Sequence, residues 1–223
     1  MSGVIEVDVW SDIACPWCYI GKRRFEAGMA AFAERHPDVD VALAFRSFEL
    51  APDAPVDFEG SQLDSLVQRK GLAADQVRAM LDHVTGVAAE LGLGIDFEAV
   101  KPTRTTAAHQ LLHYAKARGK QLAAKERLLR AYFVEGRHVG RVEELAALAA
   151  EVGLDRDDVA RSLRANEHLE AVRADERQAA AYGIRAVPFF VVDGRYGLAG
   201  AQPVETVTQV LEQVHRERTA VAP

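Results

Sequence analysis

The pattern of apolar and polar positions predicts two short α/β pieces separated by a long helical stretch. Residues 4–10 alternate between apolar and polar side chains, as a half-buried strand does. Residues 19–35 carry apolar side chains at helical spacing, and residues 39–50 read as a second strand. The chain therefore opens with a predicted β-α-β unit, which requires a right-handed crossover and parallel strands.

The middle of the chain has a different character. Residues 51–55 are rich in proline and alanine and break the strand pattern, after which the periodicity is almost wholly helical over residues 61–182. Glycine and proline divide this stretch into about six or seven predicted helices. Asp155 or Asp157 is expected to cap one of them.

The strand pattern returns near the end of the chain, over residues 187–192. Asp193-Gly194 indicates a tight hairpin turn into a further strand at 195–199. Residues 203–218 then predict a closing helix, with proline at its start.

Neither terminal piece can bury a core alone, so we predict that the two ends come together. The predicted fold class is α/β, with residues 1–55 and 183–223 forming one discontinuous domain and residues 56–182 an inserted helical domain. A connection of this length inside a domain is usually functional. We therefore expect the inserted helices to fold over Cys15 as a specificity cover.

Composition excludes several classes of function. Of the 223 residues, 49% are hydrophobic and 27% are charged, which suits a compact folded protein. The net charge is −6 and the basic residues are interspersed with acids, which argues against nucleic acid as a partner. The first residues lack a basic region followed by an apolar run, and no apolar stretch approaches about 18 residues. We predict neither signal peptide nor membrane partner, and a cytoplasmic location.

The two cysteines of the chain lie in the sequence Cys15-Pro16-Trp17-Cys18, at the predicted junction of strand and helix. In a reducing compartment such a pair indicates redox or metal chemistry rather than a structural disulfide. Proline is favoured at the first helical position, so Cys15 is the predicted N-cap and Cys18 lies one turn inside. Residues three apart share a helix face, which brings the two sulfurs within disulfide range.

This position predicts different roles for the two thiols. Cys15 would face unpaired backbone N–H groups and the positive end of the helix dipole, so we expect its pKa to fall. Cys15, exposed at the helix start, is the predicted attacking thiol, and Cys18 the resolving thiol. Trp17, between them, is expected to form an exposed recognition surface.

The residues around the cysteine pair also allow other interpretations, namely a metal site and a proton-handling role for Asp12. Cys-x-x-Cys is also the spacing of half a zinc site, but the chain has no second cysteine pair. His109 and His113 stand at i and i+4, yet no Glu-x-x-His partner is present, so we interpret them as ordinary polar residues and predict no metal. Asp12 has two open roles, handling protons for Cys18 or helping to cap the first helix.

Longer motifs support a family resemblance. The order strand, Cys-x-x-Cys, helix, strand, followed about 170 residues later by Val187-Pro188 at the start of a hairpin, resembles the thioredoxin fold. The helical insertion resembles the DsbA family. Within that family, the chain resembles the cytoplasmic FrnE-type branch. The residues that carry this resemblance are 11–21, 102–104, 131–136 and 200–203. The FrnE-type branch neighbours the 2-hydroxychromene-2-carboxylate isomerases and the kappa-class glutathione transferases.

The resemblance covers the chain from end to end and implies a substrate site. It implies that the Val187–Pro188 peptide is cis and lies beside the cysteines. Val187 would then offer its backbone N–H and C=O to an extended substrate, with Pro16 and Trp17 completing the binding surface. The alternative is an ordinary trans proline at the start of an edge strand.

Three functions follow as hypotheses. The leading one is a thiol–disulfide oxidoreductase acting on protein or small-molecule thiols and disulfides, with no cofactor beyond its own disulfide and with glutathione as a candidate co-substrate. The second is a glutathione-dependent isomerase or transferase, although the resemblance implies a serine in place of Cys15 for those branches. The third is a chaperone-like protein that binds unfolded clients. The direction of electron flow and a homodimeric state are left open.

Overall fold

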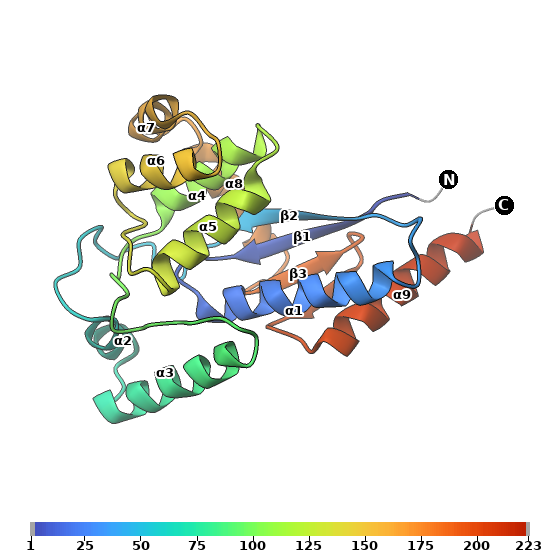
Figure 1. The fold of residues 1–223 in the computed structure, drawn as a ribbon, viewed down its shortest axis with the longest axis horizontal. Helices are drawn as coiled ribbons and strands as arrows, with labels where there is room; N and C mark the ends of the chain where they lie inside the picture. Colours follow the sequence, from blue (N-terminus) through green and yellow to red (C-terminus); the bar gives the residue numbers. More distant parts are fainter. Residues whose placement is uncertain (1–2, 222–223) are drawn as a thin grey trace.

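The computed structural model describes residues 3–221 (Figure 1). Within that range the chain forms a four-stranded sheet and nine helices. In chain order the elements are β1 (Ile5–Ser11), α1 (Pro16–Ala33), β2 (Val41–Ser47), α2 (Gln62–Lys70), α3 (Ala74–Ala89), α4 (Thr106–Lys116), α5 (Gln121–Phe133), α6 (Val142–Glu151), α7 (Arg156–Arg164), α8 (Leu169–Ala181), β3 (Phe189–Val192), β4 (Tyr196–Ala199) and α9 (Val204–Val221).

The sheet joins the two ends of the chain. Its strand order is β2-β1-β3-β4, with β1 parallel to β2 and the other neighbours antiparallel. Trp10 of β1 lies opposite Phe189 of β3, so strands about 180 residues apart share hydrogen bonds. A β-α-β piece and a β-β-α piece thus complete one sheet, and the predicted thioredoxin fold with a helical insertion is confirmed.

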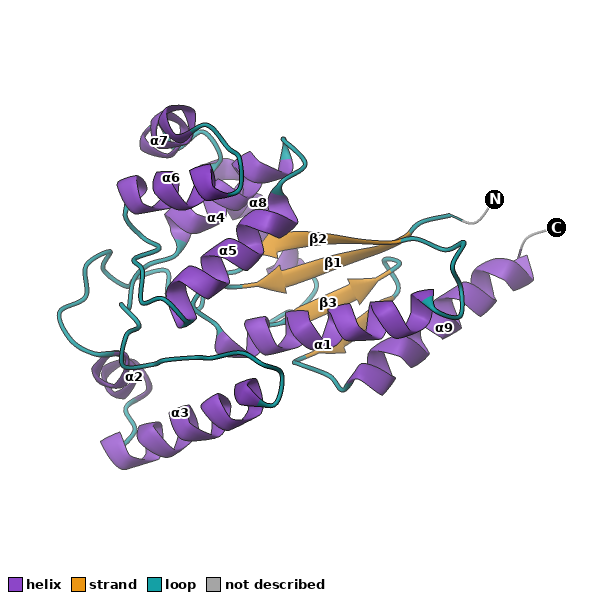
Figure 2. Cartoon of the chain, in the orientation of Figure 1, coloured by secondary structure: helices purple, strands orange, loops and turns teal. Residues whose placement is uncertain are grey.

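Helices cover both faces of the sheet (Figure 2). On one face α1 and α9 pack together over Ile5, Val7 and Val9, whose side chains point to that side as alternate residues of a strand do. On the other face Trp10 packs against Ala179 of α8. The alternation in β1 therefore divides the core into two layers.

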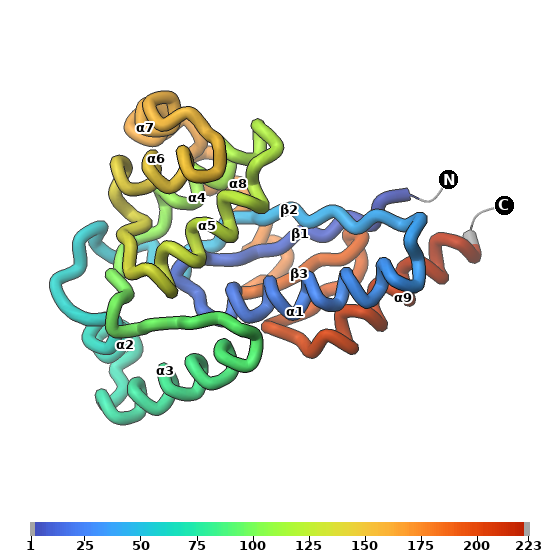
Figure 3. Tube along the Cα trace, viewed as in Figure 1, coloured from blue at the N-terminus to red at the C-terminus, as the bar shows by residue number. Residues whose placement is uncertain are grey.

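The inserted helices form two groups around the start of α1. Figure 3 shows α4–α8 gathered at one end of the sheet, with α2 and α3 on the other side of the N-terminal end of α1 in that view. The buried core of the insertion includes Ile13, Tyr19 and Ile20, which belong to the first turns of α1 and the loop before it. The cysteine-bearing junction is therefore built into the helical insertion as well as into the sheet.

Several local predictions match the structure. The insertion holds seven helices, α2 to α8, and Asp155 caps α7 by accepting a hydrogen bond from the Asp158 amide. The hairpin turn is formed by Asp193 and Gly194, both in the left-handed region with φ of 57° and 64°.

None of the helices within residues 3–221 has the length and apolar character needed to cross a membrane.

The second strand is shorter than predicted. It ends at Ser47 rather than at residue 50. The physical reason is that the Leu50 amide donates a hydrogen bond to the Asp12 carboxylate at 2.8 Å, which draws the chain away from the sheet.

Candidate active site

The start of α1 positions the two cysteines. Cys15 is the N-cap, with extended backbone angles, and Pro16 occupies the first turn, as the sequence predicts. The Cys18 amide donates to the Cys15 Sγ at 3.3 Å, so one of the free N–H groups of the helix end is satisfied by sulfur. Both thiols are free rather than joined in a disulfide. The pair is therefore described in its reduced form.

Both thiols are buried, which corrects the expectation of an exposed Cys15. Cys15 is 3% exposed and Cys18 is 1% exposed. Trp17 is half-buried rather than fully exposed, and its ring lies 6.0 Å from the ring of His83 on α3. The physical reason is that the helical insertion packs directly against this end of α1, which the local sequence does not reveal.

Burial also reverses the expected effect on the pKa of Cys15. Loss of solvation raises the pKa of this thiol well above its ordinary value, and the neighbouring Cys18 and Asp12 add to the rise. For Cys18, burial is outweighed by the hydrogen bond with Cys15 and by the charge of Lys125, which together lower its pKa. In this closed arrangement the surroundings favour ionisation of Cys18 over ionisation of Cys15, and the prediction of a lowered pKa at Cys15 is wrong.

The segment before β3 reaches the cysteines from the far end of the chain. The Cys15 thiol lies 3.6 Å from the Val187 carbonyl oxygen, to which it donates. The Val187–Pro188 peptide bond is cis. Pro188 is buried against α1, since a Cβ added at Gly21 would lie only 2.8 Å from its Cγ. The structure thus brings together Cys15, Val187 and Pro188.

Asp12 lies at the centre of a buried polar network beside the cysteines. Its carboxylate accepts hydrogen bonds from the Leu50 amide and the Thr105 hydroxyl, both at 2.8 Å, and from the Ala14 amide at 3.4 Å. The His109 Nε2 lies 3.3 Å away. Burial opposes ionisation, but His109 and the other donors lower the pKa of Asp12. Asp12 therefore ties the end of β1 to α4 and to the segment after β2.

The two histidines of α4 face different carboxylates. His109 contacts Asp12, whereas the His113 Nε2 lies 3.1 Å from Asp175 and 3.1 Å from the Ser47 hydroxyl. Their i, i+4 spacing places both on the buried face of α4, where each meets its own partner. Among the described residues, no group of three or more metal-ligating side chains is present.

Sequence reasoning missed Lys125, a buried lysine contributed by α5. Its side chain is 0% exposed, and its Nζ has no hydrogen-bond partner within residues 3–221. The Nζ lies 5.2 Å from the centre of the Phe45 ring. A signal was present in the sequence, because Lys125 falls three and four residues before Leu128 and Leu129, on an apolar face of the predicted helical stretch.

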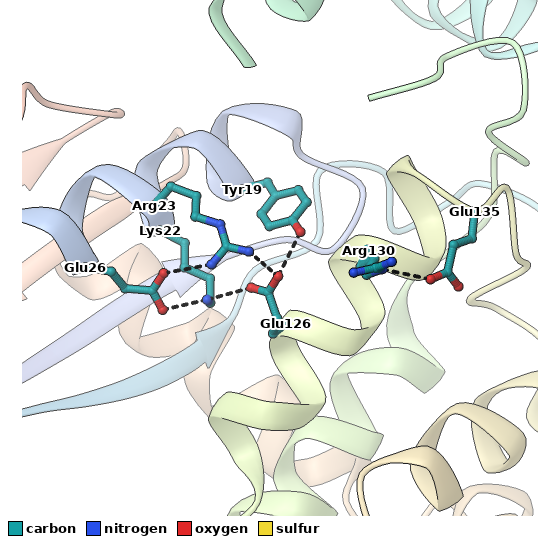
Figure 4. A network of polar contacts seen from close by, with 7 residues as sticks. All are labelled: Tyr19, Lys22, Arg23, Glu26, Glu126, Arg130 and Glu135. Atoms are coloured by element: carbon teal, nitrogen blue, oxygen red, sulfur yellow. Dashed lines mark hydrogen bonds and ion pairs between the residues drawn. The ribbon is translucent and has the colours of Figure 1, made fainter. Parts of the chain in front are cut away.

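Next to Lys125, Glu126 joins α5 to α1 (Figure 4). Its carboxylate accepts from the Tyr19 hydroxyl at 2.8 Å and pairs with Lys22 at 2.7 Å and with Arg23. Lys22 also pairs with Glu26 at 2.6 Å and is only 5% exposed. Lys22 and Arg23 of α1 thus take part in a partly buried network of charges between α1 and the insertion.

The sheet order, the crossover helix and the cysteine pair at its N-terminus define a thioredoxin-fold protein with an inserted helical segment. The profile of the DSBA-like thioredoxin domain matches residues 6–212, so the chain belongs to the DsbA-like thioredoxin family. The family predicted from the sequence motifs is confirmed.

Three similar proteins can be compared with the chain. The uncharacterized protein YwbO of Bacillus subtilis is 30% identical over 190 residues, which make up 84% of this chain and 86% of that protein. The crystal structure of a probable DsbA oxidoreductase from Streptomyces coelicolor is 42% identical and superimposes with a TM-score of 0.85, covering 94% of this chain and 89% of that one. The cytosolic disulfide reductase DsbM of Pseudomonas aeruginosa, solved with GSH, is 23% identical, with a TM-score of 0.62 over 95% of this chain and 99% of that one, and shares the fold.

Proposed function

We propose that the chain is a thiol–disulfide oxidoreductase in which Cys15 attacks a substrate disulfide and Cys18 resolves the mixed disulfide. The observation that carries this proposal is the placement of two reduced thiols at the first turn of α1, with the Cys18 amide 3.3 Å from the Cys15 Sγ. A mixed disulfide at Cys15 would have a second sulfur one helical turn away, able to displace the substrate.

The order of the two thiols rests on position rather than on the resting pKa. Cys15 precedes the helix and is flanked by the half-buried Ala14 and Pro16. Cys18 is inside the helix and is followed by the buried Tyr19 and Ile20. A substrate sulfur that displaces the local covering side chains reaches Cys15 first. The coupled thiols titrate as a pair, so a proton that leaves Cys15 can be shared with Cys18.

We propose that the substrate chain lies along the segment before β3. The Val187 carbonyl already accepts the Cys15 thiol hydrogen at 3.6 Å, so it marks the side from which Cys15 can be approached. Val187 and Pro188, together with Pro16 and Trp17, form the proposed substrate-binding surface. An extended peptide could exchange backbone hydrogen bonds with Val187 by strand addition.

We assign the cover to α3. The Trp17 ring rests 6.0 Å from His83, and Val84 and Ala88 of the same helix belong to the buried core that contains Tyr19. Movement of α3 away from Trp17 would widen access to Cys15, which is 3% exposed at rest. The helical insertion would then determine which substrates can reach Cys15.

Asp12 is proposed as a fixed negative charge rather than as a proton carrier. Its four donors and its lowered pKa favour the ionised carboxylate, so it holds the loop before Cys15 in place. No metal or nucleotide is required for this reaction. We propose the cytoplasm as its site, in keeping with the named location of the similar DsbM protein.

Trapping the mixed disulfide tests this proposal. In Cys18→Ser the attack by Cys15 remains, but the hydroxyl is a poor nucleophile toward sulfur, so release of the substrate is blocked. Protein from acid-quenched cells, separated with and without reductant, is expected to carry partners linked through Cys15. Protein partners support protein disulfide exchange, whereas a single small adduct identifies a glutathione-like substrate.

Cys15→Ser is the matched control for the trap. It keeps one thiol at nearly the same place but removes the proposed attacker, so it should trap nothing. If Cys15→Ser traps freely and Cys18→Ser does not, the order of attack is reversed. If neither variant traps a partner and the native protein leaves insulin disulfides intact, the proposed oxidoreductase function is wrong.

A further inference from the structure

The loop after β4, residues 200–202, has no part in the reaction proposed above, yet α1 holds it by a charged side chain. The Arg24 Nη1 of α1 donates a hydrogen bond to the Ala201 carbonyl oxygen at 2.8 Å. Arg24 is half-buried, and within residues 3–221 this carbonyl is its one hydrogen-bond or ion-pair partner. A hydrogen bond from a charged donor is stronger than one between neutral groups. Arg24 therefore fixes the loop rather than pairing with a carboxylate.

The same loop is bonded to the segment that contacts Cys15. The Gly200 amide donates to the Pro188 carbonyl oxygen at 2.8 Å, directly beyond the last residue pair of the β3–β4 ladder, Phe189 and Ala199. Gly200 is in the left-handed region with φ of 77°, a conformation that glycine adopts without strain as the chain leaves β4. One continuous set of hydrogen bonds thus runs from Arg24 through the loop to Pro188.

Packing on Gly21 reinforces these hydrogen bonds. Gly21 is buried on α1, and a Cβ added to it would lie 2.8 Å from the Pro188 Cγ and 3.5 Å from the Ala201 Cα. Gly21 and Arg24 are three residues apart and share a face of the helix. The segment before β3 and the loop after β4 therefore dock together on one face of α1, where Gly21 allows close approach and Arg24 supplies the hydrogen bond.

The other contact between this segment and the cysteines is lost during the proposed reaction. In the reduced protein the Cys15 thiol donates to the Val187 carbonyl oxygen at 3.6 Å. Once Cys15 is joined to a substrate sulfur it carries no hydrogen, so that bond is absent from the mixed disulfide. The contacts of Gly21 and Arg24 involve no thiol, and they remain available throughout.

We propose that Arg24 is a positioning residue for the substrate, because through residues 200–202 it holds Val187 and Pro188 against α1 while Cys15 is bonded to the substrate. This inference rests on the proposed function. The backbone groups of Val187 determine where an extended peptide can add as a strand. Holding them in place favours a disulfide carried by a polypeptide over a small disulfide that has no backbone to align. The substrate class that this arrangement favours is therefore a peptide or protein disulfide.

A comparison of two disulfides tests the proposal. One is the disulfide-linked dimer of a short blocked peptide with a central cysteine, and the other is 2-hydroxyethyl disulfide, which has no peptide backbone. The reduced protein is mixed with an excess of each and quenched with acid, and mass spectrometry follows the loss of its free thiols. Arg24→Met should slow the reaction with the peptide about tenfold and change the reaction with 2-hydroxyethyl disulfide by less than about twofold. An unchanged ratio of the two rates overturns the proposal, and so does an equal loss in both.

A second variant and two matched controls separate positioning from general damage. Gly21→Ala disturbs the same contact by its volume, without a change of charge, and should lower the ratio of the two rates as Arg24→Met does. Gly28→Ala causes a similar clash on the same helix, 2.6 Å from the Val207 Cγ1, and Arg23→Met removes the adjacent cation; both should leave the ratio unchanged. Arg24→Lys, which keeps a charged donor, should retain most of the native ratio. A fall in either control as large as that in Arg24→Met would mean a general loosening of α1 and would overturn the assignment.

Amide hydrogen exchange tests the positioning without any substrate. In the reduced protein, Arg24→Met should speed exchange of the Gly200 amide about tenfold, because the loop that presents it to Pro188 is released. The Asp193 amide, bonded to the Glu6 carbonyl at 2.8 Å at the other end of the hairpin, should be unaffected. Unchanged exchange at Gly200 overturns the proposal. If the native protein reacts with neither disulfide, the oxidoreductase function is refuted, and the exchange measurement still decides whether Arg24 holds the loop.

Discussion

The two halves of α1 lie in opposite kinds of environment. From Phe25 to Phe32 the helix is packed in an apolar layer with Phe190 and Leu211, and the Phe25 and Phe190 rings stack 4.6 Å apart. From Cys15 to Lys22 the same helix packs Tyr19 and Ile20 into the core of the insertion, but it also carries the two thiols and the buried Lys22, with Asp12 in the loop before it. One continuous helix thus passes from an ordinary core into a site where charges are held out of water.

This difference separates stability from chemistry. Apolar burial contributes about 25 cal/mol for each Å² removed from water, whereas buried thiols, carboxylates and amines cost free energy unless they are paired. The C-terminal half of α1 is therefore expected to carry the stability of the fold. The N-terminal half is expected to contribute less to stability, because its buried polar groups include the thiols that must lose and gain protons in the reaction.

The largest effect on stability is expected in the apolar half. Phe25→Ala should lower the free energy of unfolding by about 3–5 kcal/mol, because it removes a buried ring stacked on Phe190 and leaves a cavity. Chemical denaturation followed by circular dichroism measures the change. A loss below about 1 kcal/mol would show that this half of α1 does not carry the core.

A smaller loss is expected where α1 meets α9. Gly28→Ala would place a Cβ 2.6 Å from the Val207 Cγ1, and the resulting overpacking should cost about 1–3 kcal/mol. Gly86→Ala in α3 is the matched control, since it has open space around it and should stabilise the helix by about 0.5–1 kcal/mol. Equal effects of the two substitutions in thermal unfolding would contradict the close packing of α1 on α9.

In the loop before the polar half of α1, Asp12→Asn should cost about 1–2 kcal/mol at neutral pH, because a charged acceptor with four donors is replaced by an amide. The pKa of Asp12 is lowered in the folded protein from its ordinary value of 3.8. Its stabilising contribution is thus fully present above that value and is lost as the pH falls through the lower, folded value. The difference between variant and native protein should shrink in acid below about pH 4.

The exposed Asp75 provides a control for Asp12. Asp75 pairs with Arg78 at 2.9 Å, but its side chain is 94% exposed. Asp75→Asn should change stability by less than about 0.5 kcal/mol at any pH. If the two variants have similar denaturation curves at neutral pH, Asp12 does not organise the loop before Cys15.

The smallest expected effect has the opposite sign. Lys125→Met should stabilise the fold by about 1 kcal/mol at neutral pH, because it replaces a buried amine by an apolar side chain of similar volume. Burial lowers the pKa of Lys125 in the folded protein, so the folded state resists protonation of this group. The gain should be largest below the folded pKa and should vanish above the unfolded value near 10.5. A variant less stable than the native protein throughout this range would show that Lys125 is a structural residue.

Much of the site was predictable because its signals are local. Cys15 as N-cap, Pro16 in the first turn and Asp193-Gly194 at the hairpin follow from backbone preferences of single residues. The alternation in β1 likewise determined which side chains face α1 and α9. The resemblance to the DsbA family joined these local elements into one fold, which the structure confirms.

Tertiary structure alone decided the electrostatics of the site. The sequence places Cys15 at a helix end, where the dipole and free N–H groups favour a thiolate, but the helical insertion buries it and raises its pKa. Desolvation depends on residues of α3 and of the segment before β3, which lie from about 60 to more than 170 positions away, so no local pattern contains it. The same packing buries Lys125, whose charge lowers the pKa of Cys18, and places the His109 Nε2 3.3 Å from Asp12. Sequence by itself determined where the thiols stand in the fold, and the packing around them determined the direction in which the pKa of each thiol is shifted.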